Sequence, residues 1–352
     1  PNIFSAAELD EILEVIAVNF HLDLPSRLQI AIETDPRFVS SQGIQELVNA
    51  GFNRFSIGIH EFPGWSETTS QQGSSLESTL SIIETACNAT NLVSVDIYTE
   101  LPSLNFSSIR GSMRQIAQSG VPRIAAPGFA YFANECDSQN KIKASEVASP
   151  NLRMSLRELT NEILCEEGFE HIGMDQYTLP HDPLLRALKN KSLQRDCMGY
   201  TTRVETDQVG IGMSAISTFS KAYAQNHTGL SEYRSAVQDR SLPIAKGVAL
   251  TADDQIRRQV IQSIFCSGVV NFQAIYETLF EQAIPSAQIR STLQIPSGAM
   301  RLANDNLIKM TNTGFTVTKL GRHFMPKIAS LFDNYQSKNI DQANVRQFSK
   351  VL

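Results

Sequence analysis

The strongest constraint on the fold is an alternation, along the first half of the chain, of short apolar runs with longer stretches of helical periodicity. Runs of strand length cover residues 28–32, 54–59, 92–97, 123–126 and 169–174. Helical patterns cover residues 6–20, 43–50, 76–88, 106–118 and 154–167. Strands that alternate with helices are typical of βαβ units, so these patterns predict an α/β fold with a largely parallel sheet.

The pattern changes near residue 245, where helices replace the alternation. Thr251 is expected to cap a helix, with Asp254 at the capping-box position. Two more helices and a hairpin are expected at 272–281, 298–304 and 307–318. We therefore predict two domains, an α/β domain at 1–245 and a helical, winged-helix-like domain at 246–352.

The composition argues against several classes of protein. Of the 352 residues, 42% are hydrophobic and 19% charged, which is enough apolar material for a core and too little charge for disorder. The net charge of −6 disfavours a nucleic-acid partner, including DNA binding by the winged-helix-like module. The sequence has no apolar run long enough to span a membrane and no signal-peptide pattern, so we expect a cytoplasmic protein without a membrane partner.

Five cysteines are scattered along the chain, at positions 87, 136, 165, 197 and 266. None of them forms a CxxC pair, and no histidine stands at a zinc-finger spacing from any of them. We therefore expect reduced thiols and no metal site built from these residues.

Polar residues follow the predicted strands at the point where each strand ends. They are Glu33 and Asp35, His60 and Glu61, Asp96, and Asp175. Because the carboxyl ends of parallel strands meet at one edge of a sheet, these residues predict a ligand cleft there. The alternative for each residue is a helix cap or a loop carboxylate.

Several stretches of the sequence together carry a family resemblance. They are 32–37, 51–59, 172–177, 199–202, 210–217, 223–226 and 347–349, of which the span from 172 to 226 is the most specific. The chain resembles the oxygen-independent coproporphyrinogen III oxidase family of radical S-adenosylmethionine (SAM) enzymes. The resemblance implies an incomplete, open parallel β/α barrel with a helical C-terminal domain. It also implies SAM and a [4Fe–4S] cluster as cofactors, and oxidative decarboxylation of two propionates of coproporphyrinogen III to vinyl groups, giving protoporphyrinogen IX.

The chain departs from this family at its N-terminal side. The family's CxxxCxxC motif is absent, so no cluster is expected on this chain, and Pro1 aligns with the last residue of the family's GGTP segment. Two readings follow. The chain is an N-terminally truncated oxidase that is inactive as given, or it is a cluster-free paralogue that binds a tetrapyrrole or is a relic. The electron donor stays open in both.

The resemblance also implies site residues, although it assigns none as catalytic. The positions implied at SAM are Glu33, His60, Gln72 and Asp96. His60 replaces a glutamine of the family, Gln72 replaces an arginine, and Glu100 replaces a glycine beside the SAM loop. The positions implied at the substrate cavity are Asp175, Tyr200, Thr201, Thr202, Asp207, Gly210 and Gly212. The alternatives are strand-end caps for the carboxylates and a tight structural turn for the glycines.

The first predicted strand, 28–32, has no strand before it in this sequence and is expected to lie at an edge of the sheet. An apolar edge strand is a template for association. We therefore expect either self-association through this edge or its coverage by the N-terminal helix at 6–20.

Overall fold

The computed structural model describes residues 4–22, 28–59, 75–101, 106–131, 142–196, 199–203, 207–282 and 298–335. The described residues divide into two compact units, one up to Leu185 and the other from Arg186 to Tyr335. The functional division at residue 245 stays a prediction. Among the described strands, those after Arg186 pair with one another and not with the first sheet.

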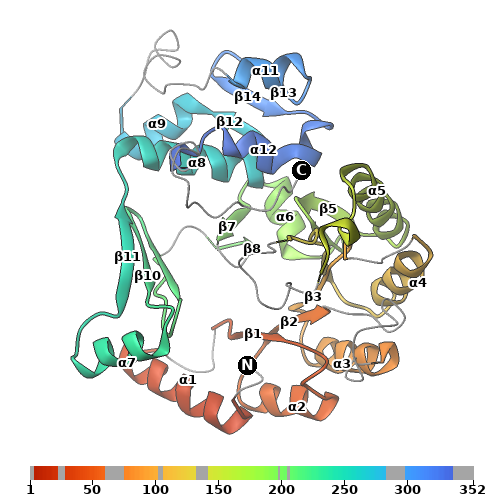
Figure 1. Ribbon diagram of the computed structural model, residues 1–352, viewed down its shortest axis with the longest axis vertical. Helices are drawn as coiled ribbons and strands as arrows, with labels where there is room; N and C mark the ends of the chain where they lie inside the picture. The colour runs from red at the N-terminus through yellow and green to blue at the C-terminus, as the bar shows by residue number, and fades with distance from the viewer. Residues whose placement is uncertain are drawn as a thin grey trace. The chain divides into compact units, whose positions relative to one another are not determined.

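The first unit is built on a six-stranded sheet (Figure 1). Its strands, in spatial order, are β1 (Ala31–Thr34), β2 (Arg54–Ile59), β3 (Val93–Ile97), β4 (Arg123–Ala125), β6 (Gln176–Thr178) and β5 (Glu170–Gly173). The first four strands are parallel, whereas β6 runs antiparallel to both β4 and β5. The open, largely parallel sheet is confirmed, with a β5–β6 hairpin at its end that the sequence patterns did not predict.

Helices connect these strands, and serines begin most of them. The helices are α1 (Ala6–Phe20), α2 (Ser41–Asn49), α3 (Leu76–Ala89), α4 (Phe106–Ala117), the short η2 (Ala144–Glu146), α5 (Pro150–Glu166) and α6 (Pro183–Lys189). Ser40, Ser75 and Ser149 each accept a hydrogen bond from the backbone N–H three residues later. These side chains satisfy N–H groups that have no partner within the helix, which defines where the helices start.

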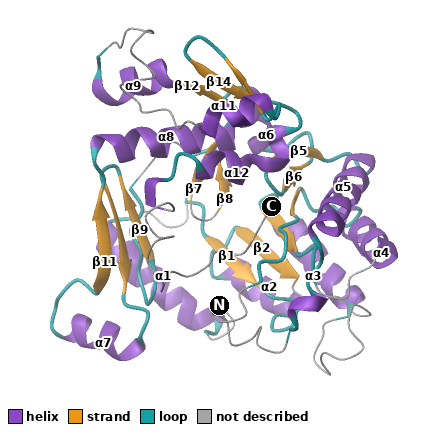
Figure 2. Ribbon diagram, turned by 45° about the horizontal axis from the view of Figure 1, so that its top comes forward, coloured by secondary structure: helices purple, strands orange, loops and turns teal. Residues whose placement is uncertain are grey.

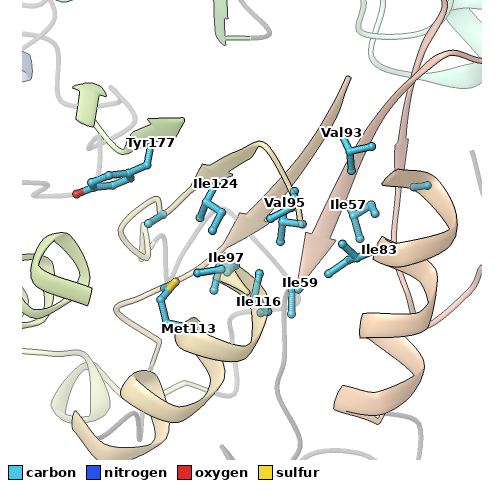
Figure 3. Packing of buried hydrophobic residues seen from close by; sticks show 14 of the residues in the cluster. Ile57, Ile59, Ile83, Val93, Val95, Ile97, Met113, Ile116, Ile124 and Tyr177 are labelled. Carbon is cyan, nitrogen blue, oxygen red and sulfur yellow. The ribbon is translucent and has the colours of Figure 1, made fainter. Parts of the chain in front are cut away.

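The core of this unit lies between one face of the sheet and its helices. Figure 3 shows Ile57 and Ile59 of β2, Val95 of β3 and Ile124 of β4 packing against helical side chains such as Ile116. Side chains of β2 and β3 alternate between buried and half-buried positions. Because successive strand residues point to opposite faces, the other face of the sheet carries the remaining, polar residues.

The second unit contains three small sheets (Figure 2). They are the hairpin of β7 (Gln194–Asp196) and β8 (Gly199–Thr201), the sheet of β9 (Ile216–Phe219), β10 (Ala222–Asn226) and β11 (Ile244–Ala249), and the sheet of β12 (Val269–Asn271), β13 (Ile308–Met310) and β14 (Gly314–Val317). The helices are α7 (Leu230–Gln238), α8 (Ala252–Cys266), α9 (Phe272–Phe280), α11 (Gly298–Asn304), η4 (Gly321–Phe324) and α12 (Met325–Ser330).

The last part of this unit matches the winged-helix-like prediction. Thr251 and Asp254 form the predicted capping box at the start of α8. The β13–β14 hairpin is antiparallel, and β12 adds a third strand beside β14. Rings of Phe272, Phe315 and Phe332 meet in its core.

Two further expectations concern the surface. None of the helices that the structure describes is long and apolar enough to cross a membrane.

Among the described strands, β1 pairs only with β2. Helix α1 packs through Ala6, Leu9 and Leu13 near α2. The helix therefore does not supply a strand for the β1 edge, and self-association through this edge stays a prediction.

Candidate functional site

A row of polar side chains crosses the face of the first sheet that is opposite to the helices. Glu33 on β1 is in register with Ser56 on β2, which in turn is in register with Ser94 on β3. Side chains in register on neighbouring strands share a face, so these three form a line. Asp96 follows Ser94 on the same face, two residues nearer the carboxyl end of β3.

Hydrogen bonds fix the middle of this row. The hydroxyl of Ser56 donates to Oδ2 of Asp96 at 2.7 Å, and the hydroxyls of Ser94 and Ser56 lie 3.2 Å apart. Glu33 is exposed, whereas Asp96 is half-buried. Ionised carboxylates only accept hydrogen bonds, so Glu33 and Asp96 fit ligand groups that donate, such as ribose hydroxyls or an ammonium.

A buried ion pair continues the row on β4. Arg123 is in register with Ser94, and its Nε lies 2.5 Å from Oδ2 of Asp182. The two side chains are only 6% and 1% exposed. Oδ1 of Asp182 also accepts a hydrogen bond from the backbone N–H of Leu184 at the start of α6. Asp182 therefore joins the start of α6 to the polar face of the sheet.

A second charged cluster lies just beyond the carboxyl ends of β3 and β4. Glu100 is completely buried, and its Oε1 accepts a hydrogen bond from Nε of Arg157 at 2.5 Å. Nε of Arg153 lies 3.3 Å from Oε2 of Glu100, and its Nη2 donates to the carbonyl of Phe129 at 2.7 Å. Both arginines come from α5, so the cluster ties that helix to the loops that follow β3 and β4.

Asp175 reaches the same end of the sheet through the β5–β6 turn. Its carbonyl accepts a hydrogen bond from the backbone N–H of Ala126, directly after β4. Nearby, burial raises the pKa of Tyr177 above its ordinary range, the charges of Cys165 and Asp175 add to the shift, and Arg157 opposes it. The Tyr177 phenol is therefore neutral at physiological pH.

Three predicted residues of the second unit lie on or next to β8. Tyr200 is buried, and its hydroxyl donates to the carbonyl of Phe265 at 2.7 Å. The hydroxyl of Thr201 accepts a hydrogen bond from the N–H of Arg203, and Thr202 is exposed. The Tyr200 hydroxyl thus has a structural partner within its own unit.

The other predicted residues form a glycine-containing loop before β9. Gly210 donates through its N–H to the hydroxyl of Ser217, and Nδ2 of Asn226 donates to the carbonyls of Gly210 and Gly212. Gly212 has a φ of 97°, and a Cβ on Gly210 would lie 2.8 Å from the backbone of Ile216, so both positions require glycine. Asp207 accepts a hydrogen bond from the N–H of Ser220.

The structure brings Glu33 and Asp96 onto one face and places Asp175 at the end of β4, whereas His60 and Gln72 lie outside the described residues. Sequence reasoning missed Ser56, which the polar positions alternating with apolar ones in β2 indicate. It also missed the partners of Glu100 and the Arg123–Asp182 pair, for which no local pattern gives a signal.

The described residues do not fit an iron–sulfur cluster. No three His, Cys, Asp or Glu side chains among them form a group that could hold a metal ion. Burial raises the pKa of Cys87 to about 11 and that of Cys266 to about 12, which disfavours the thiolate that binds iron. We therefore derive no chemical step through a cluster held by these residues.

Comparisons with known proteins give a consistent set of relatives. The oxygen-independent coproporphyrinogen III oxidase of Synechocystis sp. is 30% identical over 349 residues, covering 97% of this chain and 73% of that protein. The Escherichia coli protein of the same name is 29% identical over 358 residues, covering 100% of this chain and 75% of that protein. No protein-family profile matches the chain.

Among solved structures, coproporphyrinogen III oxidase from Escherichia coli, described as a radical SAM enzyme, matches with a TM-score of 0.86 at 27% identity. The match covers 95% of this chain and 76% of that one. The open sheet with a polar face and this likeness define the class: the chain has a radical SAM fold. Within that class, the chain belongs to the oxygen-independent coproporphyrinogen III oxidase family.

Proposed function

We propose that this chain binds coproporphyrinogen III, the compound after which its relatives are named, and that as given it does not decarboxylate it. Family membership over nearly the whole chain is the observation that carries the binding proposal. The chemistry of the described residues supports the proposal that the chain does not decarboxylate its ligand. No group of them could hold the cluster that a radical SAM reaction requires.

The polar face of the sheet supports recognition of a ligand with donor groups. Ser56 holds Asp96 in place, so the Asp96 carboxylate needs little rearrangement before it accepts further hydrogen bonds, and Glu33 is exposed to a ligand on the same face. The reaction proposed for a complete family member is oxidative decarboxylation of two propionates to vinyl groups, which gives protoporphyrinogen IX. SAM supplies the oxidising chemistry in that class of enzyme.

A second candidate is a fragment of a working oxidase, in which residues beyond the 352 of this sequence hold the cluster. The preserved polar row, with Glu33 and Asp96 at positions that the family resemblance implies at SAM, favours this candidate. The two candidates share tetrapyrrole binding and differ in catalysis.

The test measures binding and turnover separately. Titration of the purified chain with coproporphyrin III, the stable and fluorescent oxidised form, is expected to give saturable quenching. Anaerobic incubation with coproporphyrinogen III, SAM and a reductant, with protoporphyrin read by chromatography, is expected to give no product. Absence of saturable binding contradicts the binding proposal, and product formation contradicts the proposal that the chain does not decarboxylate its ligand.

A further inference from the structure

The Glu100 cluster lies at the end of the sheet at which ligands of parallel α/β folds bind. Thr99 and Glu100 lie in the loop after β3, and the N–H of Thr99 donates to the carbonyl of Pro127 after β4. The two loops are therefore in contact at the carboxyl edge. Ligands in such folds bind outside the carboxyl ends of the strands, at this edge.

Packing around Gly128 shows that the cluster leaves no room for a Cβ atom at this position. A Cβ on Gly128 would lie 2.7 Å from Oε2 of Glu100 and 2.8 Å from Nη2 of Arg157. Real Cβ atoms essentially never approach other atoms so closely. The carboxylate and the guanidinium therefore lie directly against the backbone of the β4 loop at Gly128, which is itself half-buried.

The charges make the cluster hard to displace. The Glu100 side chain is 0% exposed, and those of Arg153 and Arg157 are 6% and 27% exposed. Moving the carboxylate aside would leave two largely buried guanidinium groups without their counter-charge, which is strongly unfavourable. A ligand that enters this edge would have to meet that cost in addition to its own desolvation.

We propose that Glu100, Arg153 and Arg157 form a plug that excludes SAM from the carboxyl end of β3 and β4. The glycine that the family resemblance implies at position 100 would leave this edge open, whereas glutamate with its two arginines closes it. Glu100 is thus the residue that sets this chain's selectivity against the cofactor of its own family. This inference rests on family membership and the plug geometry, and it is independent of tetrapyrrole binding.

Calorimetric titration of the full chain with SAM, and separately with the stable analogue S-adenosylhomocysteine, tests the plug. The wild-type chain is expected to show no saturable binding up to about 1 mM, and Glu100→Gly with Arg157→Leu is expected to bind at least about tenfold more tightly. Glu166→Ala with Arg114→Leu is the matched control, because it removes an exposed carboxylate–guanidinium pair on the helices and is expected to exclude the ligand as the wild type does.

Two results overturn the proposal: saturable binding to the wild type at the affinity of the opened variant, or no gain in an opened variant that is folded by circular dichroism. If the opened variant fails to fold, Glu100→Ala with Arg153→Met and Arg157→Met removes all three charges and is judged by the same readout. Coproporphyrin III binding is measured on the same proteins. If the wild-type chain does not bind coproporphyrin III, the proposed function is contradicted, whereas the proposal about the plug is unaffected.

Discussion

The hydroxyl of Ser56 donates a hydrogen bond to Oδ2 of Asp96 at 2.7 Å and so joins two neighbouring parallel strands across the polar face of the sheet. Asp96 is half-buried, and a partly desolvated carboxylate needs such donors. The bond keeps the carboxylate on the same face as Glu33. The orientation of Asp96 thus depends on a serine 40 positions away in the sequence.

Replacing Ser56 by alanine is expected to lower the free energy of unfolding by about 1.5–3 kcal/mol, because a hydrogen bond to a charged acceptor is lost. Urea titration measures the change. Ser81→Ala is the control, since Ser81 makes an exposed contact with Ser41 on the helical side, and it is expected to change stability by less than about 0.5 kcal/mol. Equal losses in the two variants would contradict a special role for Ser56.

Loss of one partner of the buried Arg123–Asp182 pair is expected to lower the free energy of unfolding by a larger amount. Asp182→Ala leaves the Arg123 guanidinium buried without a partner and is expected to cost about 3–5 kcal/mol. Glu166→Ala, which removes a carboxylate from the exposed pair with Arg114, is expected to cost less than about 1 kcal/mol. Arg123→Met combined with Asp182→Leu is expected to recover most of the loss. A double variant no more stable than Asp182→Ala would show that capping of α6, and not the charge, is what matters.

Cysteine reactivity is expected to depend on pH in a way that follows from burial. Burial raises the pKa of Cys87 to about 11, whereas Cys165 is exposed. At pH 8.5 iodoacetamide is therefore expected to label Cys165 well before Cys87 in the native chain, as peptide mass spectrometry can measure.

The same shift affects stability. The folded-state pKa of Cys87 lies above the ordinary value of 9.0, so its neutral form is favoured in the folded state. Its contribution to stability is complete below pH 9 and is lost as the pH rises from 9 towards 11. Native labelling of Cys87 as fast as that of Cys165 at pH 8.5 would contradict the assigned burial.

Much of the fold was predictable because its strands and helices carry clear local periodicity. The apolar and polar positions of residues 54–59 alternate, and β2 has these bounds in the structure. In contrast, β6 is only three residues long, which is too short to show a period. The β10 and β11 strands consist largely of alanine, glycine and polar residues, so their sequences lack the β-branched and aromatic pattern that predicts strands.

The candidate site was predictable where it follows from strand geometry and not where it depends on long-range pairing. Glu33 and Asp96 are separate positions in the sequence, but parallel register brings them onto one face. Glu100 was visible as a departure from the family, yet Arg157 lies 57 positions away on α5. Local patterns carry no information about such a contact, so the closed edge emerges only from the fold.

The glycine loop of the second unit is expected to depend on one buried amide. Asn226→Asp removes both donors and places a carboxylate against the carbonyls of Gly210 and Gly212, so it is expected to cost more than Asn226→Ala, for which about 1–3 kcal/mol is expected. Asn19→Ala is the control, since Asn19 makes one exposed hydrogen bond on α1. Thermal unfolding measures all three variants. An aspartate variant as stable as the wild type would contradict this role of Asn226.

The short distance between Oε2 of Glu100 and the Cβ position of Gly128 predicts that substitutions at these two residues are energetically coupled. Gly128→Ala in the wild-type chain is expected to cost about 1–3 kcal/mol, because its Cβ would lie 2.7 Å from a carboxylate that two arginines hold in place. In the background of Glu100→Gly with Arg157→Leu the same change meets open space and is expected to cost almost nothing. Gly111→Ala in α4 is the control: nothing lies within 4 Å of its Cβ position, so it is expected to stabilise the chain by about 0.5–1 kcal/mol in both backgrounds. Urea titrations of the four proteins of the Gly128 cycle give the coupling energy. If Gly128→Ala costs the same in the two backgrounds, the Glu100 and Arg157 side chains move aside without a measurable cost. Side chains that move so easily would not exclude a ligand.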